Sequence, residues 1–410
     1  MPFYESPSRA WDQYEPPGRM WDYSLVDLRY QLRGRRPDSG QVMVVGITHE
    51  CQQDPLVGTL PLPRAKYADA IEKLNDLGAS VICFDIFFPE TDDRVNNAAL
   101  AAAIAEAGNV ILPIFDEKEG RDLHDPKFRG SMALIADAAL DQGHINVSPD
   151  GDGAVRRAPL IIRNLRALTR YTQLGVTGAL HHMRRSAASA ADLTGVSDET
   201  VHAPPTSADG ELMVNWRRPE DGARVGLTFL TFRDLMNDRI PEALISGKVV
   251  FIGQTATGVL NADMFEGPFD SQFGVFIQAD VADSVIAGEH VRAFPPGAHL
   301  ALLLLLCTVL GGTLLSVRLQ PLLITYPIAL VGFLTAALAV FIGYGLLVPV
   351  VPAVSAMTLL FAVAIGYGLL RKGAEAQRWE DALGVVNSTG QVAGTLLGFE
   401  GGRRRSARTR

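Results

Sequence analysis

The sequence is short of cysteine, of nucleotide-binding signatures and, over one long stretch, of charge. Its 410 residues include three cysteines, Cys51, Cys83 and Cys307, and their odd number and wide spacing exclude a disulfide framework and a cysteine-based metal site. No Ser/His/Asp or Cys/His arrangement stands out, and the adjacent His181 and His182 point in different directions on a helix, so they are not a ligand pair. This shortage of catalytic patterns disfavours an enzyme.

Charge is almost missing from residues 297–370, where His299 and Arg318 are the only Asp, Glu, Lys, Arg or His side chains. Prolines divide the stretch into three apolar runs, 298–317, 322–346 and 350–370. Each run can cross a hydrocarbon core of about 30 Å at about 1.5 Å rise per residue. A soluble helical core would keep a charged outer face, and these runs have none. The sequence therefore predicts three transmembrane helices.

The basic residues predict an orientation. Arg318 follows the first run, and Arg371 and Lys372 follow the third, so these span ends are expected in the cytoplasm. The tail 371–410 carries eight Lys or Arg against four Asp or Glu, whereas the whole chain has a net charge of −8. We therefore expect a basic cytoplasmic tail and an acidic extracytoplasmic domain over 1–296, in a multi-pass protein of the inner membrane.

Export of that domain needs a signal, and residues 1–24 contain no apolar run that could serve as one. Two explanations remain open. Either a membrane span lies upstream of residues 1–20, which would then be an N-terminal extension, or the domain is cytoplasmic and the orientation is inverted. The first explanation is favoured by the family resemblance given below.

The pattern of residues 1–296 predicts an α/β domain with a mixed, largely parallel sheet and flanking helices, joined to a three-helix transmembrane bundle. The run "SVICFDIFF" is nearly continuous in apolar residues, as in a central strand buried on both faces. A surface excursion is expected over 186–210. The expected strands are 41–48, 80–88, 109–115, 143–148, 154–162, 211–216 and 248–253, and the expected helices are 64–77, 96–107, 172–184, 228–237 and 274–287.

Three stretches raise the question of a binding site. "SGKVVFIGQTATG" (246–258) is a strand ending in a small-residue turn, whose free N–H groups near Thr255 and Thr257 would hold a polar ligand at the carboxyl edge of a sheet; a simple chain reversal is favoured over this. "SPDGDGAVRR" (148–157) resembles the start of a calcium loop but lacks the distal Glu, which favours a hairpin turn. Asp85 is a carboxylate within an apolar strand. If it lies at the carboxyl end of that strand it can face a pocket, and the favoured alternative is that it caps a neighbouring loop.

The chain as a whole resembles the type-two cyclase/histidine-kinase-associated sensory extracellular (CHASE type-two) family over residues 21–290, and we take 21–296 as the sensory domain. Two departures from the family are Thr48-His49-Glu50, where an acidic residue tends to follow the first strand, and Gln278, where histidine is frequent. The matching blocks are "SLVDLRYQLRG", "LPLPRAKYADAIEKL", "ASVICFDIFF", "GHINVSPDGDGAVRRAPL", "GKVVFIGQTATG" and "FGVFIQADVADSVIAG".

The resemblance implies a bacterial extracytoplasmic sensor in signal transduction, with a membrane span just before "DLRYQLRG". After Lys372 the sequence has no output-domain-sized core, so the expected protein acts through a cytoplasmic or membrane partner. The expected ligand contacts are Arg64, Asp85, Thr255 and Asp263, with no cofactor and no metal. The alternatives are a metal-assisted hydrolase using Asp85 and Asp263, or a structural subunit of a membrane assembly.

The tail itself gives weaker indications. "AEAQRWEDAL" (374–383) is expected to continue the last helix as a linker. Beyond it, Gly390, Gly394 and Gly398 recur at four-residue spacing, which favours a flexible tail over a helix-packing seam. The arginines of "GGRRRSARTR" fit membrane lipid or an acidic partner, and the absence of interleaved aromatic residues disfavours nucleic acid. A homodimer is left open.

Overall fold

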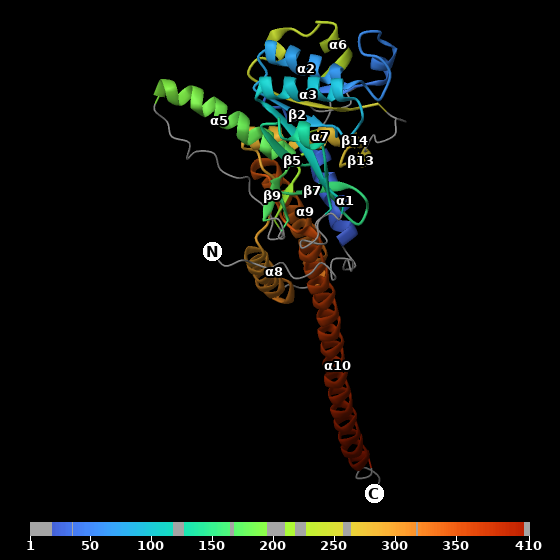
Figure 1. The fold of residues 1–410 in the computed structure, drawn as a ribbon. Coiled ribbons are helices and arrows are strands. Elements are labelled where there is room, and N and C mark those ends of the chain that lie inside the picture. The colour runs from blue at the N-terminus through green and yellow to red at the C-terminus, as the bar shows by residue number, and fades with distance from the viewer. Residues whose placement is uncertain are drawn as a thin grey trace. The chain divides into compact units, whose positions relative to one another are not determined.

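The computed structural model describes residues 19–34, 36–117, 127–164, 168–194, 210–217, 227–256, 264–316 and 319–405. The chain divides into two compact units. The first consists of Met1–Phe294 with Leu338–Val348, and the second of Pro295–Ala337 with Pro349–Arg410. Figure 1 shows the course of the chain through both units.

The first unit is built on a seven-stranded sheet in the order β11-β1-β12-β2-β3-β4, with β5 also paired to β3. All pairs are parallel except β3 with β4, which confirms the expected mixed, largely parallel sheet. The strands β1 and β12 are buried almost throughout, in keeping with their apolar runs. The strands are β1 (Val42–Ile47), β2 (Val81–Asp85), β3 (Val110–Asp116), β4 (Phe128–Gly130), β5 (Asp141–His144), β11 (Thr228–Thr231) and β12 (Val249–Gln254).

Helices cover both faces of this sheet (Figure 1). One face holds α2 (Arg64–Asp76), α3 (Arg94–Ala107) and α6 (Phe232–Met236), and the other holds α5 (Leu174–Thr194) and α7 (Gly274–Ala287). This three-layer arrangement buries an apolar cluster on each side of the sheet.

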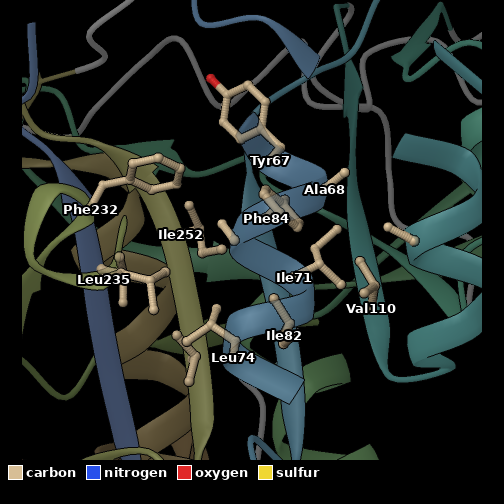
Figure 2. Packing of buried hydrophobic residues seen from close by; sticks show 14 of the residues in the cluster. Tyr67, Ala68, Ile71, Leu74, Ile82, Phe84, Val110, Phe232, Leu235 and Ile252 are labelled. Carbon is tan, nitrogen blue, oxygen red and sulfur yellow. The ribbon is translucent and has the colours of Figure 1, made fainter. Parts of the chain in front are cut away.

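The core on the α2 side shows how the helical pattern is used. Tyr67, Ile71 and Leu74 recur at helical spacing on α2 and are all buried (Figure 2). The ring of Tyr67 packs edge-on against those of Phe84, at 6.1 Å between centroids, and Phe88, at 5.1 Å. The apolar face of α2 therefore fixes the helix over β2.

On the opposite face, α5 and α7 cross at close range. A methyl group on Gly175 of α5 would overlap the carbonyl oxygen of Gln278 on α7. The side chain of Gln278 also hydrogen-bonds that of Gln173, just before α5. Glycine at position 175 is thus a packing requirement of this crossing.

Smaller sheets complete the first unit, together with α1 (Arg19–Arg33). In the three-stranded sheet, β7 lies between β6 and β10. The connection from β6 to β7 is an antiparallel hairpin, which confirms the hairpin interpretation of residues 148–157. The remaining elements are β6 (Ser148–Pro149), β7 (Val155–Pro159), β8 (Ile161–Asn164), β9 (Thr169–Thr172), β10 (Glu211–Met213), β13 (Met264–Glu266), β14 (Ser271–Phe273), β15 (Arg292–Ala293), β16 (Leu346–Leu347), α4 (Ala133–Ala136), η2 (His49–Gln53) and η4 (Glu242–Leu244).

Four expectations of local structure need correction. The strand expected at 143–148 is divided between β5, which ends at His144, and β6, which begins at Ser148. The helix expected at 228–237 is wrong in its first half, which is β11; α6 starts only after Thr231, whose hydroxyl accepts the N–H of Asp234 at 3.0 Å as an N-cap. The single strand expected at 154–162 is two strands, β7 and β8. The surface excursion expected over 186–210 is wrong for 186–194, where α5 continues to Thr194, and residues 195–209 lie outside the described residues.

The second unit contains the apolar helices α8 (Pro296–Ser316), α9 (Leu319–Tyr344, whose last residues belong to the first unit) and α10 (Val350–Arg405). Two segments are long and apolar enough to cross a membrane, Leu323–Tyr344 and Val350–Val386. Within the described part of α8 the apolar segment is Gly297–Val309, which is shorter than a span. The third span, and with it the three-helix bundle, stays a prediction.

Within this unit α9 and α10 are in contact. The rings of Tyr326 and Phe361 stack at 4.2 Å, and the hydroxyl groups of Tyr326 and Thr358 lie 2.7 Å apart. The helix α10 continues without interruption to Arg405. The linker helix over 374–383 is confirmed, and the flexible tail expected beyond it is wrong. The helix runs on through six glycines after residue 383, each of which costs a helix about 1 kcal/mol relative to alanine.

Candidate functional site

The carboxyl edge of the parallel sheet brings together two of the four residues expected to contact a ligand. Asp85 is the last residue of β2 and lies opposite Gly253 of the neighbouring strand β12. Thr255 follows directly after β12. Open α/β sheets bind ligands at this edge, so Asp85 and Thr255 occupy the appropriate place for a site.

The side chain of Thr255 is buried, with 4% of the residue exposed. Its backbone N–H donates to the carbonyl of Ile47 at 3.1 Å, so the free N–H expected in this turn is already used at position 255. Its Oγ1 has no hydrogen-bond partner among the described residues. Thr257 and Asp263 lie outside the described residues.

Asp85 lies beside the start of a helix. Its Oδ2 is 3.4 Å from the position that a Cβ of Gly274 would take, and Gly274 is the first residue of α7. A helix N-terminus stabilises a nearby carboxylate through its N–H groups and dipole. This position fits the alternative in which Asp85 holds a neighbouring element in place.

Arg64 belongs to a different part of the edge. It is buried, and its guanidinium donates to the side-chain oxygen of Asn97, to the carbonyl of Pro89 and, at 3.0 Å, to the sulfur of Met132. Burial is the main cause that lowers the pKa of Arg64 from its ordinary value. These bonds hold the loop between β2 and α3 in place.

That loop forms the wall of a hollow of about 600 Å³. Arg64 thus positions the wall through Asn97, which lines the hollow. Among the described residues, no group of three or more His, Cys, Asp or Glu side chains could hold a metal ion. The lining residues are Glu90, Thr91, Asp92, Arg94, Asn97, Met132 and Leu134.

A second group of polar residues joins α1 to the β6–β7 hairpin. Arg156 on β7 is only 2% exposed and forms bidentate contacts with Asp27 of α1, at 2.8 and 2.6 Å, and with Asp152 of the hairpin, at 2.9 and 2.8 Å. Asp150 accepts a further bond at 2.9 Å and also pairs with Arg157. Burial lowers the pKa of Arg156, but hydrogen bonds to Asp27, Asp152 and Asp150 together raise it above its ordinary value.

Other residues of α1 form hydrogen bonds to the segment after β10. The Tyr30 hydroxyl donates to the carbonyl of Val214 at 2.8 Å, and burial raises the pKa of Tyr30. Arg33 donates to the side chain of Asn215 at 2.6 Å and to the carbonyl of Trp216 at 2.7 Å. The motif "DLRYQLRG" is therefore a set of anchors from one helix to several distant segments.

Similar hydrogen bonds join α1 and the residues after it to Leu338–Val348. This segment belongs to the first unit and contains the end of α9 and the turn towards α10. Arg29 donates to the carbonyl of Val348 at 2.8 Å, and Arg36 donates to that of Ile342 at 2.8 Å. The strand β16 pairs with β15 in parallel, and the ring of Phe341 packs at 5.3 Å from that of Tyr30. We call α1 together with Leu338–Val348 the junction.

The junction borders a buried charged group. Arg217 forms an ion pair with Asp283 of α7, and both side chains are at most 1% exposed. Nearby Asp280 is also buried, and burial raises its pKa to about 8, opposed by Arg217 and assisted by Asp283. At neutral pH Asp280 is mainly protonated, so the buried group carries the paired carboxylate of Asp283 without a second negative charge beside it.

Sequence reasoning missed the junction as a site. Asp27, Arg29 and the junction's partner Arg156 stand in blocks that the family resemblance uses, whereas Leu338–Val348 lies outside those blocks. Asp27 and Arg156 are 129 positions apart, and Arg29 and Val348 are 319 apart. The available signal was the concentration of arginines and aspartates in two of those blocks, "DLRYQLRG" and "DGDGAVRR".

The described features define a class of protein: an α/β domain that incorporates the connection between two candidate membrane spans. The family model of the CHASE2 domain matches residues 11–313, and the chain therefore belongs to the CHASE2 family. CHASE2 is a sensory extracellular domain of signalling proteins. No curated protein and no solved structure matches the chain.

Proposed function

We propose that this protein is a membrane-anchored extracytoplasmic sensor that transmits its signal to a partner. The observation that carries the proposal is the junction, in which the connection between the candidate spans α9 and α10 is hydrogen-bonded into the CHASE2 domain. A rearrangement of α1 or β15 in the domain would move Leu338–Val348, and both candidate spans continue directly from that segment.

The sensing step requires two states of the domain with different affinity for a ligand. The proposed ligand contacts are Asp85 and Thr255 at the carboxyl edge of the sheet, together with Arg64 and with Asp263, which lies outside the described residues. The helix α7 connects this edge to the junction. It starts beside Asp85, and its residue Asp283 accepts the backbone N–H of Ser39, shortly after α1, at 2.9 Å. The output is a shift of α10, whose helix continues beyond its apolar segment.

The orientation follows from the number of spans. Three spans, α8 included, place the CHASE2 domain and the distal part of α10 on opposite sides of the membrane, whereas two place them on the same side. Cysteine labelling tests this. Val95 on α3 is 80% exposed and Leu383 on α10 is 58% exposed, while Cys51 and Cys83 are fully buried.

The background for labelling is Cys307→Ser. We expect a membrane-impermeant maleimide to label Val95→Cys in intact spheroplasts and Leu383→Cys only after lysis. Labelling of both sites, or of Leu383→Cys alone, in intact spheroplasts would refute the proposed orientation.

The ligand contacts are tested separately. Asp85→Asn removes charge at the sheet edge, and Asp263→Asn removes the charge of the other proposed carboxylate, each with little change in volume. We expect each to weaken the change in tryptic cleavage of α10 that periplasmic extract induces in the full chain. If both variants fold and respond as the unaltered chain does, the sheet edge is not the sensing site. Co-purification from native membranes through α10 would identify the partner.

A further inference from the structure

A hollow of about 340 Å³ lies within the first unit, where the junction meets the segment after α7. Its walls come from the end of α1 and the residues after it, from the segment around β15, and from the end of α9. The lining residues are Arg33, Arg36, Asn215, Gly288, Glu289, His290, Val291, Arg292, Gly343, Tyr344 and Gly345.

Positive charge prevails in this hollow. Three arginines, Arg33, Arg36 and Arg292, face one carboxylate, Glu289. Glu289 is shared, because it lies 3.2 Å from Arg36 and 3.7 Å from Arg217. Arg292 forms no ion pair within the part of the chain that the structure describes. The arginines therefore have spare capacity for an anion.

Two residues that line the hollow each carry a buried nitrogen without a hydrogen-bond partner among the described residues. The Nη atoms of Arg33 are engaged by Asn215 and Trp216, but its buried Nε has no partner among the described residues. The same is true of Nδ1 of His290, whose pKa is lowered by burial and by Arg292. Burial and the charges of Arg36 and Arg217 also lower the pKa of Arg33, with Tyr30 opposing them, so the site holds like charges that an anion would relieve.

The position of the hollow suggests where the anion comes from. Gly343 and Tyr344 are the last residues of the candidate span Leu323–Tyr344. Tyr344 is 81% exposed, and tyrosines at span ends lie at the level of lipid headgroups. Gly345 has a φ of 64° and lets the chain turn from α9 into β16 at this level.

We propose that this hollow binds a phosphate group, held by Arg292, Arg36 and the unused donors of Arg33 and His290. Two sources share this chemistry, the headgroup of an anionic phospholipid and free phosphate. The lipid source rests on the proposed membrane anchoring, whereas the hollow itself belongs to the CHASE2 domain. A bound phosphate would tie α1, β15 and the end of α9 together and so adjust the junction.

The test uses the full chain purified in a zwitterionic detergent. Calorimetric titrations with dioctanoyl phosphatidylglycerol, dioctanoyl phosphatidylcholine and inorganic phosphate compare the sources. Arg292→Gln removes the unpaired charge. Gly343→Leu adds a side chain to the lining of the hollow without changing charge, and its Cβ meets nothing within 4 Å. Arg170→Gln, at an exposed position on β9, is the matched control.

We expect Arg292→Gln and Gly343→Leu each to weaken binding about tenfold, and Arg170→Gln to leave it within about twofold. Tight binding of phosphatidylglycerol with weak binding of phosphate assigns the lipid source, and the reverse assigns the free anion. If neither phosphatidylglycerol nor inorganic phosphate binds, or if Arg292→Gln or Gly343→Leu binds as Arg170→Gln does, the proposed site is wrong. A failed labelling test with intact phosphate binding would remove the membrane orientation alone.

Discussion

Arg156 offers the strongest single test of the junction, because one buried guanidinium holds α1 against the β6–β7 hairpin. Arg156→Met keeps much of the side-chain length and removes the charge. Asp27, Asp152 and Asp150 then lose five contacts of 2.6 to 2.9 Å. Asp150 keeps Arg157, but the side chain of Asp150 is 1% exposed and its remaining capacity stays unmet.

The expected cost follows from the burial of the group. Breaking a buried ion pair by removing one partner costs about 3–5 kcal/mol, because the remaining charge is left in a poorly solvated place. In a domain of this size about 1 kcal/mol shifts Tm by roughly 2–4 °C. We therefore expect a Tm lower by about 6–20 °C. Asp27→Asn should cost less, about 1–2 kcal/mol, because Asp27 is 22% exposed and the asparagine can still accept one bond.

Two measurements are needed to separate stability from anchoring. Thermal unfolding of the full chain, followed by circular dichroism, gives Tm. Limited tryptic cleavage at Arg29 and Arg33 reports how firmly α1 is held, and both variants should speed it. Arg170→Gln is the control for a lost surface arginine.

A Tm for Arg156→Met within about 1 °C of that of Arg170→Gln would refute the assigned role of the cluster. A lower Tm with unchanged cleavage of α1 would show that the cluster stabilises the hairpin only. In that case the junction would depend on Tyr30 and Arg33 instead.

The remaining predictions concern pH and packing. Hydrogen bonds from Arg156 lower the pKa of Asp152 below its ordinary value of 3.8. The stability from this pair is therefore present above pH 3.8 and is lost as pH falls through the lower pKa of the folded state. Asp152→Asn should flatten the acid side of a curve of Tm against pH. Asp280 has the opposite sign, since its pKa of about 8 exceeds the unfolded value, and its contribution to stability is lost as pH rises from about 4 to 8. Asp280→Asn should therefore match the unaltered chain near pH 4 but have a Tm several degrees higher at pH 9. A Tm gap that is the same at both pH values would contradict this. Gly175→Ala should lower the free energy of unfolding by about 1–3 kcal/mol or more, because the added methyl group overlaps the backbone of α7. The control Gly384→Ala, whose Cβ meets nothing within 4 Å, should be neutral or slightly stabilising in thermal unfolding. Equal effects of the two variants would refute the close crossing of α5 and α7.

Local patterns predicted much of the secondary structure. The helix over α2 follows from Tyr67, Ile71 and Leu74 at helical spacing, and the central strands follow from their apolar runs. The failure at 228–237 has a physical reason. Thr228, Phe229 and Thr231 favour a strand, and the helix begins only where Thr231 can cap it.

The candidate site was predicted only in part. Asp85 and Thr255 share an edge because parallel strands end together, which the strand order predicts in general terms. The use of the Thr255 N–H by Ile47, and the place of Asp85 beside the start of α7, depend on neighbours far along the chain. Arg64 stays a proposed ligand contact, and its hydrogen bonds to Asn97 and Pro89, distant in sequence or set by the loop after β2, could not be read from the local pattern.

The sequence by itself determined the apolar candidate spans and the alternation of strands and helices, because hydrophobicity and periodicity are properties of short segments that need no partner. Only the tertiary structure decided the junction and the basic hollow, because ion pairs and hydrogen bonds are made between particular atoms. Arg29 and Val348, 319 positions apart, meet through the folding of everything between them.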